Sequence, residues 1–299
     1  MGSENFRAAL LMIASMVFFA FEDMFIKLLT AQMPYAQVLG LIGVIGGLSF
    51  WAVLRLRGGR LFTRDLCNPA LVLRNLGEAL GSVLFVSALA LGELAPTAAI
   101  MQALPLVIVM GAALFLGEPV GWRRWSAIGA GFFGVLLVIR PGIDGFSATS
   151  LLALLAVLCF AARDIVTRRV PAHVHSLQLS ASAFLGLALV SIPMALVLGQ
   201  RPVLPDAWQW LQVAGCLTVG VLGYGLLVSA TRLGEASALA PYRYVRLVFA
   251  LVLALIVFHE RPDTLTLLGA AVIVASGAYA MWREALLRRR IRRAAGLIA

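Results

Sequence analysis

The chain has 299 residues, of which 62% are hydrophobic and only 13% are charged, and its formal net charge is +10 at pH 7. A soluble domain carries about 25% charged residues, so this composition excludes an ordinary water-exposed globule and predicts an integral membrane protein. The positive charge does not indicate a nucleic-acid partner, because the basic residues gather in short loops on one side of the predicted spans.

Ten apolar windows, each about long enough to cross a bilayer as a helix, follow one another along the chain. Their continuous apolar runs favour helices over barrel strands, in which apolar residues alternate with polar ones. The connections are too short for a soluble domain, so the sequence predicts one all-α domain embedded in the lipid bilayer. The predicted spans are 8–29, 36–54, 70–91, 95–117, 122–139, 149–169, 176–198, 209–231, 236–258 and 263–282.

The distribution of basic residues predicts the orientation of these spans. With the N-terminus in the cytoplasm, sixteen basic residues fall in cytoplasmic segments and four on the opposite side, namely Lys27, Arg140, Arg201 and Arg261. This positive-inside bias predicts that both termini are cytoplasmic, in a multi-pass protein of the bacterial inner membrane. The arginine-rich tail at 288–293 is expected to lie against anionic headgroups.

Parts of the two halves of the chain resemble each other. FVSALALGELAPTAAI from Phe85 matches LVSATRLGEASALAPY from Leu227 at an offset of 142, and FAFED from Phe19 matches FAARD from Phe160 at an offset of 141. The chain therefore reads as two copies of five helices. Because five is odd, the second copy enters the membrane from the other side. Such inverted repeats are typical of secondary transporters, whose substrate site lies near the midplane between the halves.

The predicted repeats comprise residues 1–142 and 143–299, the second with the basic tail, and form one transport domain. Pairs of small residues four apart, such as Gly43 and Gly47 in the second window, allow close helix packing. This spacing is explained equally by packing within a monomer and by a homodimer interface, so both states stay open.

The motifs of other membrane-protein classes are missing from the sequence. Lys27 is the single lysine and does not follow a glycine-rich loop, so there is no Walker A motif to support ATP-driven pumping. The three cysteines and three histidines form no metal-ligand pattern. The sequence predicts no metal, no cofactor and no enzymatic activity, and it favours gradient-driven transport of a small molecule; a membrane enzyme is a distant alternative.

Charged residues within spans are expensive and usually face a cavity or a partner. Glu22 has no base four residues away, and the four glutamates at span ends are expected to be water-facing or capping residues. Three other acids within spans have a base four residues away and could form an ion pair within their own helix: Asp23 with Lys27, Asp164 with Arg168, and Glu78 with Arg74. The four span-end glutamates are Glu93, Glu118, Glu235 and Glu260. Apart from local pairing, Glu22, Asp23 and Asp164 are candidates for counter-charges or for a coupling proton.

The stretch APYRYVR places Arg243 and Arg246 inside the ninth window with no acid within four residues. Either an acid on another helix, such as Glu78 or Glu22, pairs with them, or a substrate anion does. Arginine can hold a carboxylate through two parallel hydrogen bonds, and flanking tyrosines can stack on a ring. The predicted substrate-binding residues are Arg243, Tyr242, Tyr244, Arg246, Gln102 and Glu78.

Two long stretches, LPLVIVMGAALFLGEPVGWRRWSAIGAGFFGVLLVIRPG from Leu104 and APYRYVRLVFALVLALIVFHERPDTLTLLGAAVIV from Ala240, resemble the drug/metabolite transporter superfamily, specifically its EamA-type ten-helix carriers. The resemblance implies ten helices in two repeats and transport of small organic solutes. FAARDIVTRR from Phe160 and APYRY are similar to the branch that takes up S-adenosylmethionine, although Arg246 is not typical of that branch.

Two functions remain open on the sequence. The first is a carrier of a small zwitterionic or carboxylate-bearing metabolite, in which Arg243 holds the carboxylate and Glu22, Asp23 or Glu78 holds an ammonium or a coupling proton. The second is an exporter of lipophilic cations, in which the carboxylates form the main site and the arginines are internal counter-charges.

Overall fold

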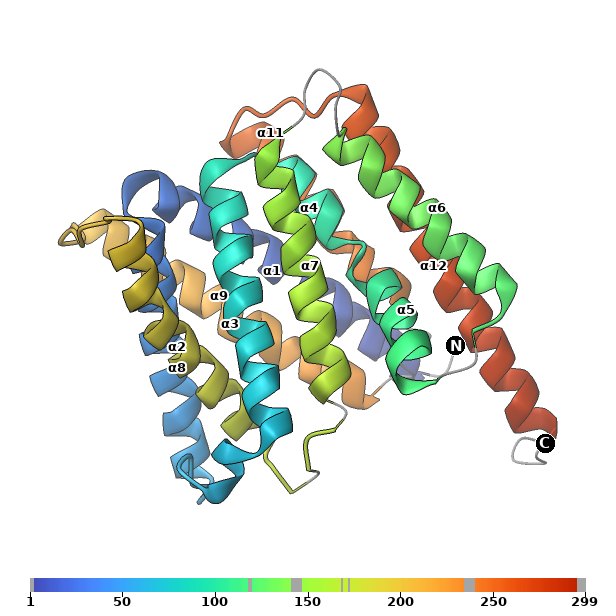
Figure 1. Cartoon of the computed structure of the whole chain (residues 1–299), viewed down its shortest axis with the longest axis horizontal. Coiled ribbons are helices and arrows are strands. Elements are labelled where there is room, and N and C mark those ends of the chain that lie inside the picture. The colour runs from blue at the N-terminus through green and yellow to red at the C-terminus, as the bar shows by residue number, and fades with distance from the viewer. Residues whose placement is uncertain are drawn as a thin grey trace.

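The fold was determined as a computed structural model, which describes residues 3–117, 120–140, 147–167, 169–171, 173–233 and 240–294 (Figure 1). Every regular element in these ranges is a helix, so the all-α class is confirmed. The elements are α1 (Ser3–Gln32), α2 (Tyr35–Leu56), η1 (Arg64–Cys67), α3 (Pro69–Leu91), α4 (Leu94–Met101), α5 (Leu104–Leu116), α6 (Trp122–Ile139), α7 (Ala148–Thr167), α8 (Ser176–Val197), α9 (Ala207–Leu233), η2 (Ala240–Tyr244), α11 (Val245–Val257) and α12 (Thr264–Ala294).

Seven segments within the described residues are long and apolar enough to cross a membrane. They correspond to the first four predicted windows and to the sixth, seventh and eighth. The fifth and tenth windows contain the shorter apolar helices Trp125–Ile139 and Thr264–Ala280, and the ninth begins at residues 236–239, outside the described ranges. A membrane protein is therefore confirmed, whereas the count of ten spans stays a prediction.

The fourth window is interrupted in its middle. α4 ends at Met101, and the backbone amides of Gln102 and Ala103 donate to carbonyls three residues earlier, at 3.1 and 2.9 Å, as in a 3₁₀ turn. α5 then begins with Pro105 in its first turn, where the missing amide hydrogen costs nothing. A similar change occurs at Val245, where the 3₁₀ helix η2 passes into α11.

The helices pack in pairs that join distant parts of the chain: α1 with α9, α2 with α8, α3 with α7, and α6 with α12. Glycine permits two of these approaches. A Cβ on Gly43 would lie 2.8 Å from the Phe184 carbonyl oxygen of α8, and one on Gly134 would lie 2.8 Å from the Gly269 carbonyl oxygen of α12. These small residues therefore serve close packing within the monomer.

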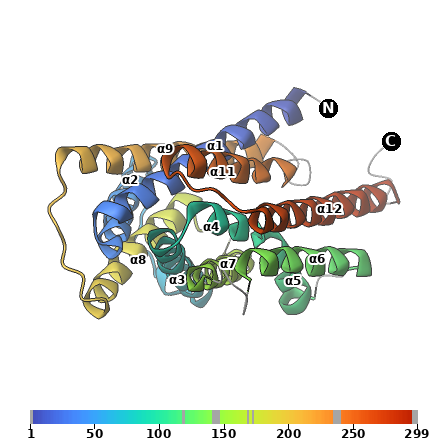
Figure 2. The ribbon, with the colours of Figure 1, turned by 90° about the horizontal axis from the view of Figure 1, so that it is seen from above.

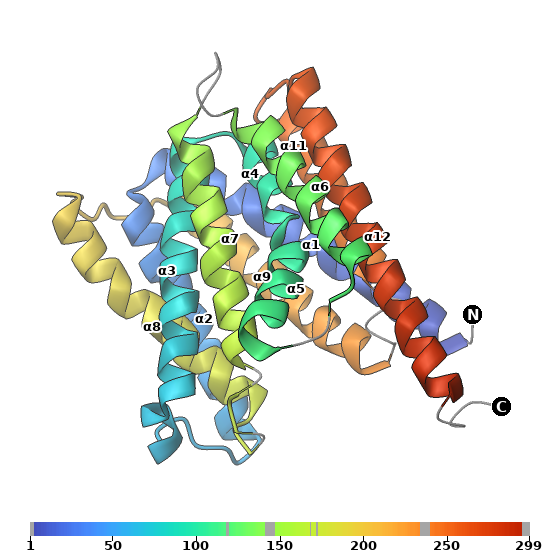
Figure 3. The same ribbon diagram turned by 45° about the vertical axis from the view of Figure 1, so that its right-hand side comes forward.

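The arrangement of the helices places α4 at the centre of the molecule. In Figure 2, α1, α9 and α11 lie together along one side, α3 and α7 along the other, and α4 between them. In Figure 3, the beginning of α1 and the end of α12 lie near each other, on the same lower side as the short helix η1. Large apolar side chains such as Leu196 and Val197, 77% and 85% exposed, face outward, as expected for contact with lipid.

Candidate functional site

A cavity of about 550 Å³ lies among the helices of both halves. It reaches Thr167 and Ser176, at the ends of α7 and α8 nearest the basic loops, and it takes residues from the early part of α3 and the late part of α7. No described lining residue comes from the opposite ends of these helices. The cavity therefore belongs to the half of the protein on the predicted cytoplasmic side.

One wall of the cavity carries a charged cluster that joins α3 to α7. Arg163 donates through Nη1 to both carboxylate oxygens of Glu78, at 3.0 and 2.9 Å, and pairs with Asp164 at 2.8 Å. Arg74 contacts the same Glu78 at 3.2 Å, so the local pairing that the sequence left open as an alternative is present. Asp164 takes its neighbour Arg163 as partner; Arg168, the partner predicted for it, lies outside the described residues.

Arg246 does not face the cavity as an unpaired cation. Its Nη2 and Nε donate to the two carboxylate oxygens of Asp23, at 2.6 and 2.9 Å, and the Asp23 side chain is only 4% exposed. The interhelical ion pair that the sequence left open is thus present, with Asp23 as the acid in place of Glu78 or Glu22. The local pair of Asp23 with Lys27 is wrong, because Arg246 offers two aligned donors from α11.

Lys27 contacts Glu260 instead, 2.7 Å away, and the Glu260 carboxylate accepts hydrogen bonds from the backbone amides of Leu94 and Ala95. The Glu260 side chain is 8% exposed. The expectation that this residue caps a helix is confirmed, and the capped helix is α4, from the other half of the chain. The expectations for Glu118 and Glu235 lie outside the described residues.

Two charged groups in the cavity, Arg243 and Glu22, form no salt bridge among the described residues. Arg243 lines the cavity with an exposed side chain that forms no hydrogen bond or ion pair there. Glu22 lines it from α1, and its carboxylate lies against Gly220 of α9, where a Cβ would be 2.6 Å from Oε1. A glycine at position 220 thus leaves the carboxylate its space.

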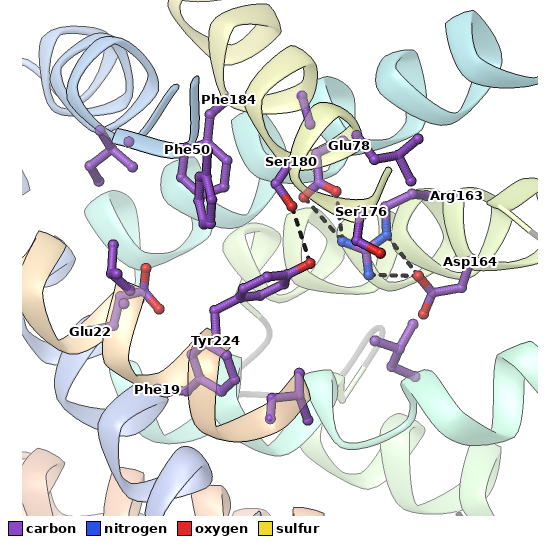
Figure 4. A pocket seen from close by; sticks show the side chains of 18 of the residues that line it. Phe19, Glu22, Phe50, Glu78, Arg163, Asp164, Ser176, Ser180, Phe184 and Tyr224 are labelled. Atoms are coloured by element: carbon purple, nitrogen blue, oxygen red, sulfur yellow. Dashed lines mark hydrogen bonds and ion pairs between the residues drawn. The ribbon is translucent and has the colours of Figure 1, made fainter. Parts of the chain in front are cut away.

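Aromatic side chains that the sequence analysis did not single out form a second wall. The Phe50 ring centroid lies 5.3 Å from that of Phe184 and 5.5 Å from that of Tyr224, and Ser180 donates to the Tyr224 hydroxyl at 3.1 Å. In Figure 4, Tyr224 points across the cavity between Glu22 and the Arg163 cluster. The only signal for Tyr224 in the sequence is its position between two glycines.

The other predicted site residues divide between the cavity and its surroundings. Gln102, at the interruption between α4 and α5, lines the cavity. Tyr242 packs against the cluster that contains Met12 and Met16, and Tyr244 is 6% exposed with its hydroxyl against Gly277 of α12. Neither tyrosine is among the described lining residues. The aromatic surface expected from them is supplied in this conformation by α2, α8 and α9.

The described residues contain no group of three or more histidine, cysteine, aspartate or glutamate side chains arranged to hold a metal ion. Among the described residues, the cavity offers groups for recognition by charge, hydrogen bonding and stacking, including the guanidinium of Arg243 and the carboxylate of Glu22.

The family description "EamA-like transporter family" matches two stretches of the chain, residues 6–140 and 147–282. Among curated proteins, the S-adenosylmethionine uptake transporter of Rickettsia bellii is 29% identical over 213 residues, which cover 71% of this chain and 72% of the relative. The riboflavin transporter of Vibrio cholerae is 29% identical over 64% of each chain. The pseudopaline exporter CntI of Pseudomonas aeruginosa is 26% identical over 86% of this chain and 90% of the relative.

A crystal structure of a further protein shows the same fold. It superposes with a TM-score of 0.59 and 23% sequence identity, and the match covers 93% of this chain and 98% of the other. Similarity at this level concerns the arrangement of the helices, which is therefore shared along nearly the whole length of both chains.

Proposed function

Because the chain belongs to the EamA-like transporter family, we propose that it is a gradient-driven carrier which moves a small zwitterionic or carboxylate-bearing metabolite across the inner membrane by alternating access. The family and the named relatives make the protein a small-molecule transporter rather than an enzyme. The substrate class and the mechanism are the parts that we propose.

The observation that carries the proposed substrate class is the state of the arginines around the cavity. Arg74, Arg163 and Arg246 each contact a carboxylate of the protein. Arg243 alone among these cavity-lining arginines has no such partner within the described residues, yet its side chain is exposed to the cavity. A guanidinium within a membrane protein is costly without an anion, and a substrate carboxylate would supply one with two parallel hydrogen bonds.

The cavity also offers places for the rest of such a molecule. Glu22 can hold an ammonium group or a coupling proton, and the wall of Phe50, Phe184 and Tyr224 can stack on a ring. S-Adenosylmethionine, which carries a carboxylate, an ammonium and an adenine, is the first compound to test, because relatives are named as its uptake transporters. Arg243 takes the carboxylate in this arrangement.

Alternating access is supported by the symmetry between the halves. The family description matches the chain twice, and the interruption at Gln102 and the change from η2 to α11 after Tyr244 lie 142 positions apart. Interrupted helices in corresponding positions of two repeats are typical of carriers that bind substrate between them. In the two proposed repeats, α1 corresponds to α7 and α3 corresponds to α9. The pair α1–α9 therefore corresponds to the pair α7–α3, and both pairs are packed together.

The direct test is ligand-dependent thermal stability of the purified protein. The panel contains S-adenosylmethionine, amino acids, dicarboxylates, riboflavin and quaternary amines. A ligand at about 100 times its dissociation constant adds roughly 2.7 kcal/mol to the folded state. We expect carboxylate-bearing compounds to stabilise the wild type and Arg201→Ala, a control in the exposed α8–α9 connection, but not Arg243→Ala. Equal stabilisation of Arg243→Ala would remove Arg243 from the site.

A second function, export of lipophilic cations, is favoured by one observation. Glu22 is a carboxylate in the cavity without a cationic partner among the described residues, and Phe19, Phe50 and Phe184 also line the cavity. Under this function, quaternary amines stabilise the wild type and Arg243→Ala alike, and Glu22→Gln abolishes their effect. The two variants therefore separate the two functions within one set of measurements.

A further inference from the structure

Lys27 and Glu260 lie on the side of the protein away from the cavity mouth, and their contact joins the two halves of the chain. Lys27 comes from the late part of α1, and Glu260 from the connection between α11 and α12. Nζ and Oε1 are 2.7 Å apart, and the two side chains are only 14% and 8% exposed. A pair this sheltered is only slightly screened by salt or water.

Both side chains of the pair also form hydrogen bonds with backbone groups. The Glu260 carboxylate accepts from the amides of Leu94 and Ala95, at 2.9 and 3.0 Å, and so caps the first turn of α4, where a negative charge is favoured. Lys27 donates to the Gly92 carbonyl oxygen at 2.7 Å, and its Nζ lies 5.1 Å from the centroid of the Phe258 ring. Four segments thus meet here: α1, the α3–α4 connection, α4 and the α11–α12 connection.

The same short helix links this cluster to the cavity. α4 has eight residues, Leu94–Met101, which at 1.5 Å per residue correspond to about 12 Å. Its first turn is held by Glu260, and Gln102 directly after its last turn lines the cavity. α4 therefore connects the Lys27–Glu260 pair at its first turn with the cavity at its last turn, so that a movement of this short helix would change both.

We propose that Lys27, Glu260 and the first turn of α4 form a lock, which keeps the cavity closed on the side opposite Thr167 and Ser176 and must separate before substrate can pass there. The inference rests on the proposed transport function. In the described structure the lock is closed while the cavity extends toward Ser176. Weakening the lock favours the opposite state, in which Lys27 becomes accessible and Ser176 becomes shielded.

The chain is well suited to a test that needs no substrate, because Lys27 is its single lysine. A water-soluble amine reagent applied to the purified protein in detergent reports Lys27, apart from the N-terminal amine, which peptide mass spectrometry separates. A Ser176→Cys variant in a Cys67→Ser, Cys159→Ser, Cys216→Ser background reports the cavity mouth through maleimide labelling. In Glu260→Gln we expect Lys27 labelling to rise several-fold and Cys labelling at position 176 to fall.

The decrease in cysteine labelling at position 176 distinguishes a lock from a local contact. Loss of a purely local ion pair would expose Lys27 but would leave the labelling at position 176 unchanged. Asp263→Asn is the matched control: Asp263 contacts Arg140 and Thr266 on the same side and makes no hydrogen bond to α4. It should change neither signal. Lys27→Gln, which leaves the cap on α4 in place, repeats the measurement at position 176 if Glu260→Gln does not fold. Unchanged labelling at position 176 in a folded variant of either residue overturns the lock.

Covalent closure provides the reciprocal experiment. In the cysteine-free background, Lys27→Cys with Glu260→Cys is joined by a short, cleavable thiol cross-linker, and S-adenosylmethionine uptake is followed in proteoliposomes. We expect uptake to stop on cross-linking and to return on cleavage; uptake by the cross-linked protein would also overturn the lock. If the labelling responses occur but the wild type transports no compound, the proposed function fails and the lock stands.

Discussion

Asp23 on α1 accepts two hydrogen bonds from Arg246 on α11, 223 positions later in the chain, at 2.9 and 2.6 Å. The carboxylate is almost fully buried, and the guanidinium lies over the Phe19 ring, 5.5 Å from its centroid. This pair fixes the helix that begins at Val245 against the first helix of the chain. It also gives Arg246 an internal partner, whereas Arg243 has no salt-bridge partner among the described residues.

The Asp23–Arg246 pair should show strong energetic coupling. Asp23→Asn or Arg246→Gln alone leaves one buried charge without its partner and is expected to cost about 3 to 5 kcal/mol of folding free energy. The double variant should cost clearly less than the sum of the two. A double-mutant cycle on the unfolding free energy in denaturing detergent measures the coupling; additive effects would show that the pair does not stabilise the fold.

The close approach of α6 to α12 should be sensitive to a single methyl group. Gly134→Ala places a Cβ 2.8 Å from the Gly269 carbonyl oxygen and should destabilise the protein by about 1 to 3 kcal/mol through overpacking. Gly129→Ala on the same helix meets no atom within 4 Å and should be neutral or stabilising by up to about 1 kcal/mol. Thermal unfolding of both variants checks this, and equal effects would contradict the tight packing.

The ion pair between Asp263 and Arg140 should make the stability of the fold depend on pH in the acidic range. The hydrogen bond from Arg140 lowers the pKa of Asp263 from 3.8 to about 2. A carboxyl group whose pKa is lower in the folded state stabilises the fold above its unfolded pKa, and this contribution is lost as the pH falls through the folded value. Asp263→Asn should therefore lower the melting temperature at pH 5, and the difference from the wild type should shrink toward pH 2. A constant difference across this range would contradict the pair.

The three cysteines should react with a small maleimide in the order of their exposure. Cys67 is exposed in η1, Cys159 is intermediate, and Cys216, on α9 beside the cavity, is 1% exposed. We expect Cys67 to be modified first and Cys216 last, with all three equivalent after denaturation, as followed by peptide mass spectrometry. Early modification of Cys216 would mean that α9 packs less closely than described.

The sequence predicts seven spans well, because each of these described segments contains a long apolar run that hydropathy alone identifies. Of the contacts in the site, the local pair Arg74–Glu78, which the sequence offers as an alternative, is present within one helix, although the base precedes the acid in the less favourable order. The sequence also indicates the stretch APYRYVR as unusual, since two arginines there have no acid nearby in the sequence. These successes depend on neighbours along the chain.

The remaining features of the site depend on which helices become neighbours. Asp23 has Lys27 at the favourable spacing, yet it pairs with Arg246, and Lys27 pairs with Glu260. Local spacing cannot anticipate this, because bidentate geometry and the burial of both partners are decided by the packing of α1 against α11. Tyr224 is a comparable case: its place in the cavity follows from its contact with Phe50 and Ser180, on two other helices.

The charges in and beside the cavity have an electrical consequence. Arg74, Arg163, Arg243 and Arg246 are matched by four carboxylates, those of Glu22, Asp23, Glu78 and Asp164, so this set of eight has no formal net charge. Moving one elementary charge across the whole membrane against its potential requires about 2.3 kcal/mol per 100 mV. If this neutral set moves as one body, its movement against that potential requires little work, and the voltage dependence of transport should then report the charge of the substrate and of any co-transported ion.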